Sequence, residues 1–245
     1  MIIGELNVQK KNTKNKWLIQ KKNNNNNHVF WKYINYDNED SLFMKNNKVT
    51  VNAAAIMPLK DFLKRIKTPG VNIYVISKML ADLSAQLNNL DIHQKTLLYL
   101  EISNIMVIVY DDDYFKENNV DTSDIKFIYA STESIVNIDK SLDDSVIVNI
   151  PYLKNQYLSP ELHNLYTLPG YIHKSCCYYS LVLISIVMIV DHRLIDLPPG
   201  KNIFKTPLTK NILLEHIKEI KPTKLYHLIE RAVDNDPKKR TFLFV

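Results

Sequence analysis

The chain has 245 residues, of which 46% are apolar, so it is long and hydrophobic enough to fold around a sizeable core. Its formal charge of +5 arises within residues 1–22, which hold six lysines and one glutamate, and the remaining residues are formally neutral. A short basic segment is typical of a solvated end of a chain, and nothing else indicates a nucleic-acid surface, so no nucleic-acid partner is expected.

The sequence predicts a protein that stays in the cytoplasm. Residues 1–22 lack the long apolar segment of a signal peptide. The only cysteines, Cys176 and Cys177, are adjacent, where a disulfide between them would be strained, so a reducing compartment fits. The apolar run at 181–190 has about half of the roughly 20 residues that cross a bilayer, which predicts a buried helix and no membrane span.

Residues 1–52 form a basic, Asn-rich region that we expect to be a reduced or partly disordered lobe. Short β-like segments at 17–19 and 28–33 flank an asparagine run at 23–27, which predicts a small sheet at most.

Residues 53–245 are predicted to form one α+β unit that is mainly helical. Apolar residues recur every three or four positions in 58–66 and in 73–90, as in amphipathic helices. Residues 105–109 and 126–129 are candidate strands of a β-hairpin, and the three aspartates at 111–113 between them are predicted to be a solvated turn.

The rest of the chain is predicted to be an irregular loop followed by helices. The loop covers 132–158 and is expected to contain extended pieces, and Ser159 is expected to cap a short helix that has Pro160 in its first turn. Residues 175–190 are apolar on all sides, which indicates a helix at the centre of the core. Two further helices are expected at 208–219 and 222–234.

This order of elements resembles the C-terminal lobe of a protein kinase, over residues 53–245. Ser159-Pro160-Glu161 resembles the A-P-E element that closes the kinase activation segment, and Asp236-Pro237-Lys238-Lys239-Arg240 resembles the D-P-x-x-R element near the end of the domain. In the family a buried ion pair joins these motifs, which implies a pair between Glu161 and Arg240. Tyr179-Ser180-Leu181 and Thr223-Lys224-Leu225-Tyr226 are similar to stretches in kinase-like proteins of large DNA viruses, which implies a host-cell cytoplasm or a virion.

The resemblance also implies that the catalytic equipment is lost. Residues 101–107 are similar to the end of a kinase catalytic loop, which matches Asn104 to the metal-binding asparagine. Tyr99 then stands in place of the catalytic aspartate, Tyr129 in place of the D-F-G aspartate, and Cys177 in place of the aspartate that braces the catalytic loop. A tyrosine cannot accept a hydroxyl proton near neutral pH.

The nucleotide-binding lobe of a kinase is expected to be rudimentary or absent. Gly4 is the only glycine before residue 70, so a Gly-rich loop is missing. No lysine of the V-A-I-K type is followed by a plausible helix glutamate, and about 50 residues are too few for the full lobe.

The leading hypothesis is therefore an inactive pseudokinase that acts as a binding or regulatory scaffold for another protein, without a cofactor or a metal. One alternative is a divergent active serine/threonine kinase that uses ATP and magnesium, with Glu101 as a substitute base. Another is an unrelated helical interaction protein in which the two motifs are coincidences. His173 with Cys176 and Cys177 is expected to be core packing, because no further ligand pair is spaced to complete a zinc site.

Overall fold

The computed structural model describes residues 1–11, 15–21, 43–45, 48–66, 71–111, 114, 122–149, 157–191 and 209–242. Of these residues, 44% are helical and 27% are in strands, so the prediction of a mainly helical fold is wrong. The difference comes from short strands, many of three to five residues, which carry too few side chains for a clear alternation of apolar and polar positions. Within the described part, none of the helices combines the length and the apolar character needed to span a bilayer.

A five-stranded antiparallel sheet is built from the N-terminal region, with the strand order β1-β2-β3-β5-β4. Its strands are β1 (Ile2–Ile3), β2 (Leu6–Lys10), β3 (Lys16–Lys21), β4 (Phe43–Lys45) and β5 (Lys48–Asn52). The expectation of a rudimentary or absent N-terminal lobe is therefore wrong. The predicted segment 17–19 lies in β3, whereas the predicted segment 28–33 and the asparagine run lie outside the described residues.

A second sheet has the order β6-β8-β9 and consists of β6 (Ala55–Pro58), β8 (Ile105–Val109) and β9 (Ile125–Tyr129). The antiparallel pairing of β8 with β9 confirms the predicted hairpin, and the pairing of β6 with β8 was not foreseen. The 3-10 turn η2 (Thr122–Asp124) leads into β9. Of the three aspartates expected in the connection, Asp112 and Asp113 lie outside the described residues.

Helix α3 (Ile73–Ile92) seals the outer edge of this sheet with polar side chains. Asp82 Oδ2 accepts a 2.9 Å hydrogen bond from the Phe127 amide, and Gln86 both accepts from the Tyr129 amide and donates to its carbonyl, each at 2.9 Å. These contacts take the place of a fourth strand for the Phe127 amide and for the amide and carbonyl of Tyr129.

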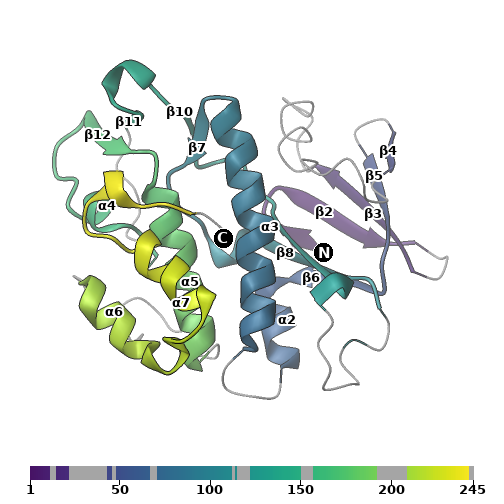
Figure 1. Cartoon of the computed structure of the whole chain (residues 1–245). Coiled ribbons are helices and arrows are strands. Elements are labelled where there is room, and N and C mark those ends of the chain that lie inside the picture. Colours follow the sequence, from purple (N-terminus) through teal and green to yellow (C-terminus); the bar gives the residue numbers. More distant parts are fainter. Residues whose placement is uncertain are drawn as a thin grey trace.

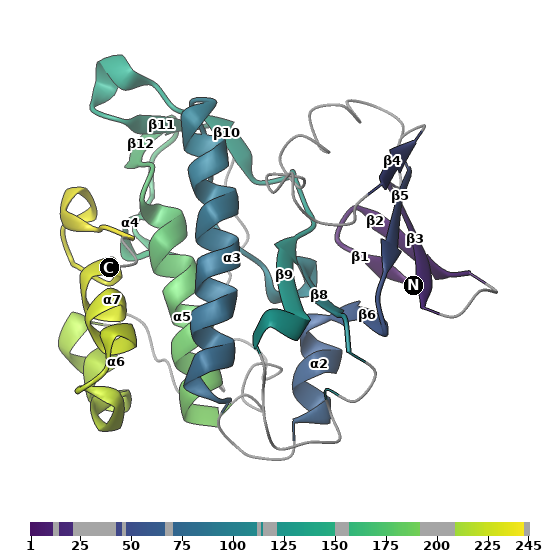
Figure 2. The ribbon, with the colours of Figure 1, turned by 45° about the vertical axis from the view of Figure 1, so that its right-hand side comes forward.

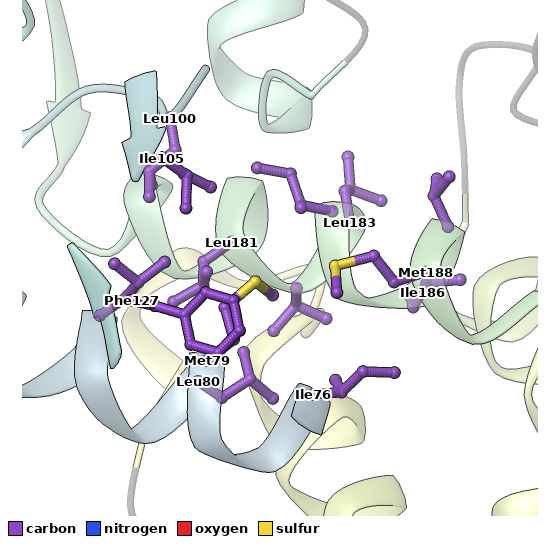
Figure 3. Close-up of a cluster of buried hydrophobic side chains, with 14 of the residues drawn as sticks. Ile76, Met79, Leu80, Leu100, Ile105, Phe127, Leu181, Leu183, Ile186 and Met188 are labelled. Atoms are coloured by element: carbon purple, nitrogen blue, oxygen red, sulfur yellow. The ribbon is translucent and has the colours of Figure 1, made fainter. Parts of the chain in front are cut away.

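The helices pack around α3 and α5 (Cys176–Asp191), which lie side by side (Figure 1). The buried helix expected at 175–190 and the two helices expected at 58–66 and 73–90 are confirmed. The other helical elements are α2 (Leu59–Arg65), η1 (Ile102–Asn104), η3 (Lys140–Leu142), α4 (Pro160–His163), α6 (Lys210–His216), η5 (Lys218–Ile220), α7 (Lys224–Ala232) and η6 (Pro237–Lys239). Figure 3 shows side chains of α3, α5 and β9 in contact, among them Met79, Leu181 and Phe127.

Two small antiparallel sheets of two strands each complete the fold. Strand β7 (Lys95–Leu97) pairs with β10 (Ile135–Asn137), and β11 (Ser145–Val148) pairs with β12 (Gly170–His173). Both β10 and β11 lie within the segment that was predicted to be an irregular loop, whose residues 150–156 are outside the described residues.

The N-terminal sheet packs directly onto the second sheet (Figure 2). One buried cluster joins them. It contains Ile3, Leu6, Val8, Ile19, Val49, Val51 and Ala53 from the N-terminal region and Ile56, Met106, Ile108, Ile128 and Ala130 from the second sheet and the residue after β9. The space between the two sheets is thus filled by apolar side chains of the chain itself.

Candidate functional site

Glu161 and Arg240 are brought together by the structure, 79 residues apart in sequence. Arg240 donates from two nitrogens to the two carboxylate oxygens of Glu161, at 2.5 and 3.0 Å. Its Nε also donates to the Asp234 carbonyl at 2.8 Å, and its guanidinium lies 4.9 Å from the centre of the Tyr179 ring. The Arg240 side chain is fully buried, so this bidentate pair holds α4, α5 and the turn at η6 in one arrangement.

Ser159 occupies the N-cap position of α4 but does not cap it, contrary to the prediction. The Ser159 carbonyl, not its hydroxyl, takes part in the helix, where it accepts from the His163 amide at 3.0 Å. The Ser159 hydroxyl is buried and has no hydrogen-bond partner within the described part of the chain.

Of the residues matched to kinase catalytic positions, Glu101, Asn104 and Tyr129 come together. The Tyr129 hydroxyl oxygen accepts from Asn104 Nδ2 and from the Glu101 amide, both at 3.4 Å. Burial raises the pKa of Tyr129, so the phenol stays protonated at neutral pH. The side-chain amide of Asn104, which was expected to bind a metal, therefore donates a hydrogen bond to a neutral phenol.

Tyr99, the residue in place of the catalytic aspartate, lies elsewhere. It packs against the apolar cluster that contains Leu98, Leu158 and Leu162, and burial raises its pKa. Tyr99 therefore belongs to the packing beneath α4.

Two residues that sequence reasoning missed, Glu5 and Lys21, meet at the junction of the two sheets. Lys21 ends β3 with its side chain only 8% exposed, and its Nζ lies 3.3 Å from Glu5 Oε2. Glu5 Oε1 accepts from the amide of Thr132, from its hydroxyl at 2.6 Å and from the Ser131 hydroxyl at 3.4 Å. Lys21 does not fit the pattern of a lysine paired with a helix glutamate, because its partner, Glu5, is in the turn between β1 and β2. The sequence indicates a buried lysine here only through spacing: Lys21 follows Ile19 by two residues and so shares the inward face of the strand.

Gly4 allows the turn between β1 and β2 to rest on the segment after β9. It has a φ of +54°, and a Cβ built there would lie 2.3 Å from the Ala130 carbonyl oxygen and 3.2 Å from Asn104 Oδ1. The next residue, Glu5, donates its amide to the same carbonyl at 2.8 Å. A side chain larger than hydrogen would therefore force this turn away from Ala130 and Asn104.

The Glu5 carboxylate is stabilised as an anion. Burial alone would raise its pKa, but the hydrogen bonds from Thr132 and the charge of Lys21 outweigh that effect, and the pKa lies below its usual value. At neutral pH this site therefore contains a carboxylate held by a cation, two hydroxyls and a backbone amide.

No protein-family model matches the chain, and a search of the curated proteins finds no significant match. The kinase resemblance therefore remains a prediction that rests on the motifs and on the order of elements.

Of the three side chains considered for a zinc site, the two cysteines are packed in the core, and His173 is half-buried. His173 contacts Ser175 at 2.9 Å, and Cys176 and Cys177 are buried on α5. Burial raises the pKa of Cys177 to about 11 and that of Cys176 well above its usual value, so neither is a thiolate at neutral pH. Within the described ranges, no three His, Cys, Asp or Glu side chains are gathered as a metal site.

Proposed function

We propose that this chain is a kinase-like binding or regulatory module that does not transfer phosphate. The observation that carries the proposal is the closed junction between the two sheets. The Gly4-Glu5 turn rests on Ala130 and Asn104, and apolar side chains fill the space beneath the N-terminal sheet. In a kinase the corresponding space between a Gly-rich turn and the catalytic residues holds the nucleotide.

The arrangement of elements supports the kinase-like part of the proposal. A five-stranded antiparallel sheet precedes β6, two helices and the β8–β9 hairpin, and the motif pair Glu161 and Arg240 follows. The Gly4-Glu5 turn lies between the first two strands and Lys21 lies on the third, which are the places of the Gly-rich turn and the phosphate-contacting lysine in a kinase.

The chemistry of the junction supports the absence of phosphoryl transfer. The reaction requires a group that orients the attacking hydroxyl and carboxylates that hold magnesium against the phosphates. Tyr99 is matched to the aspartate that orients the hydroxyl, and Tyr129 is matched to the D-F-G aspartate that holds magnesium. Both are protonated phenols at neutral pH. Lys21 pairs with an internal carboxylate.

The ligand that we propose for this module is another protein. Large apolar side chains are exposed on the two-stranded sheet of β11 and β12, where Ile147 and Tyr171 lie directly opposite each other and are 41% and 61% exposed. Exposed apolar side chains that gather in this way are common at protein interfaces.

A phosphotransfer assay tests the proposal. The purified chain is incubated with γ-labelled ATP, magnesium or manganese, and a generic acceptor protein, beside the variants Glu101→Gln and Glu133→Gln. We expect no transfer above background from any of the three. Transfer by the wild type that disappears in Glu101→Gln, but persists in Glu133→Gln, would establish the active-kinase alternative.

A further inference from the structure

The groups around the Glu5 carboxylate form a set of donors that suits an oxyanion. Lys21 Nζ approaches one carboxylate oxygen, and the amide and hydroxyl of Thr132 with the Ser131 hydroxyl approach the other. These donors come from β3 and from the segment after β9, which are more than 100 residues apart in sequence. A lysine, a backbone amide and hydroxyls that converge on one point are typical of phosphate sites.

The Glu5 carboxylate and the donors around it come from different parts of the two sheets. Lys21 ends a six-residue strand in the middle of the sheet, and Ser131 and Thr132 follow a strand paired with β8. Glu5 enters from the turn after β1, which has only two residues and lies at the edge of the sheet. Lys21 is therefore held by a central strand, and Ser131 and Thr132 lie directly after β9, whereas the carboxylate comes from a turn at the edge of the sheet.

We propose that the Glu5 side chain is an internal ligand of an oxyanion site, and that Lys21, Ser131 and Thr132 bind a phosphate group when that carboxylate is removed. This inference rests on the proposed function and explains it further. The chain holds its two sheets together with its own carboxylate, in the place where a nucleotide-binding protein would need a ligand.

The tethered carboxylate is expected to exclude free anions from the wild type. Glu5 is held next to the donors by the β1–β2 hairpin, so a phosphate in solution must compete with a high local concentration of carboxylate. Removal of the Glu5 side chain is expected to improve affinity for pyrophosphate by about 100-fold or more.

The experiment compares wild type, Glu5→Ala and Glu5→Ala/Lys21→Met in thermal-shift titrations with inorganic pyrophosphate, with sodium chloride at matched ionic strength as the control. In Glu5→Ala, pyrophosphate at ten times its Kd should raise Tm by about 3–6 °C. Wild type should not respond at the same concentration, and the double variant should bind at least tenfold more weakly because the cation is gone.

Further ligands identify the source of the phosphate. ATP without metal is compared with tripolyphosphate on Glu5→Ala. Equal affinities identify the ligand as the phosphate chain alone, and tighter binding of ATP identifies it as a nucleotide. Either result upholds the oxyanion site.

A folded Glu5→Ala protein that shows no saturable response to pyrophosphate, or a response that Lys21→Met leaves unchanged, would overturn the inference. If Glu5→Ala is unfolded alone, recovery of its circular dichroism with 50 mM pyrophosphate supports the site, and failure to recover overturns it. The proposed function is tested separately, because it concerns ATP and metal with the wild-type chain.

Discussion

The Glu5 carboxylate accepts a 2.6 Å hydrogen bond from the hydroxyl of Thr132, which is 127 residues further along the chain. The contact joins the first turn of the N-terminal sheet to the segment after β9, at the junction of the two sheets. Beneath it the two sheets share a core of side chains that includes Ile3, Met106 and Ile128. The junction between the two sheets is thus closed by the Glu5 contact and by the shared apolar core.

The Glu5 contact makes stability depend on pH in the acidic range. Because the pKa of Glu5 in the folded protein is below the usual 4.5, the unfolded chain binds more protons between these two values, and stability rises with pH there. The contribution is complete above pH 4.5 and is lost as pH falls through the lowered pKa.

Urea unfolding of wild type and Glu5→Gln measures this effect. At pH 7 the variant should be less stable by about 1–3 kcal/mol, because an amide cannot neutralise Lys21. At pH 3 the gap should be smaller. A gap that is the same at both pH values would contradict the assigned carboxylate.

Removal of one partner of the Glu161 and Arg240 pair should be costly. Glu161→Ala leaves a fully buried guanidinium without its counter-charge, and we expect a loss of about 3–5 kcal/mol in the free energy of unfolding. Glu219→Ala, an exposed glutamate on η5, is the control and should change stability by less than about 0.5 kcal/mol. Similar losses in both variants would favour the alternative in which the two motifs are coincidences.

Two buried serines should respond in opposite ways to replacement by alanine. The Ser180 hydroxyl is fully buried and accepts from the Leu100 amide at 2.9 Å, so Ser180→Ala should cost about 1–3 kcal/mol. The buried hydroxyl of Ser159 makes no such contact within the described residues, so Ser159→Ala should be neutral or stabilising. Chemical denaturation of both variants tests this, and an equal loss would indicate that Ser159 has a partner.

The buried side chain of Gln86 should contribute to the stability of the fold through its two hydrogen bonds to the Tyr129 backbone. Gln86→Ala removes both hydrogen bonds to the Tyr129 backbone at the edge of β9 and should cost about 1–3 kcal/mol. Asn88→Ala, on the exposed face of the same helix, should be neutral or stabilising by up to about 0.7 kcal/mol, because alanine has the higher helix propensity. Hydrogen exchange of the Tyr129 amide gives a local readout, and unchanged protection in Gln86→Ala would contradict the role assigned to this side chain.

The helices could be predicted from the sequence because each carries its own signal. Helix α3 repeats apolar residues every three or four positions over 20 residues, and α5 is apolar on all sides. The N-terminal sheet could not be predicted in the same way. Its strands have two to six residues, and β3 pairs with β5 across a gap of more than 25 residues, so long-range pairing decides the structure.

The candidate site was predictable only in part. Two motifs led to Glu161 and Arg240, and the strand expected at 126–129 led to Tyr129, because those residues stand in recognisable local patterns. The meeting of Glu5, Lys21 and Thr132 depends on three segments that only the packed sheets bring together. The sequence does contain one hint, a lysine on the inward side of a strand, where a charge needs a partner.

The measurement that tests the central claim most directly is a thermal-shift titration of the wild-type chain with ATP and magnesium or manganese. A ligand that binds only the folded state must raise Tm. Because the junction is filled by Glu5 and by the shared apolar core, we expect no shift up to millimolar nucleotide. A saturable, metal-dependent rise in Tm would contradict the closed junction and the proposed function together.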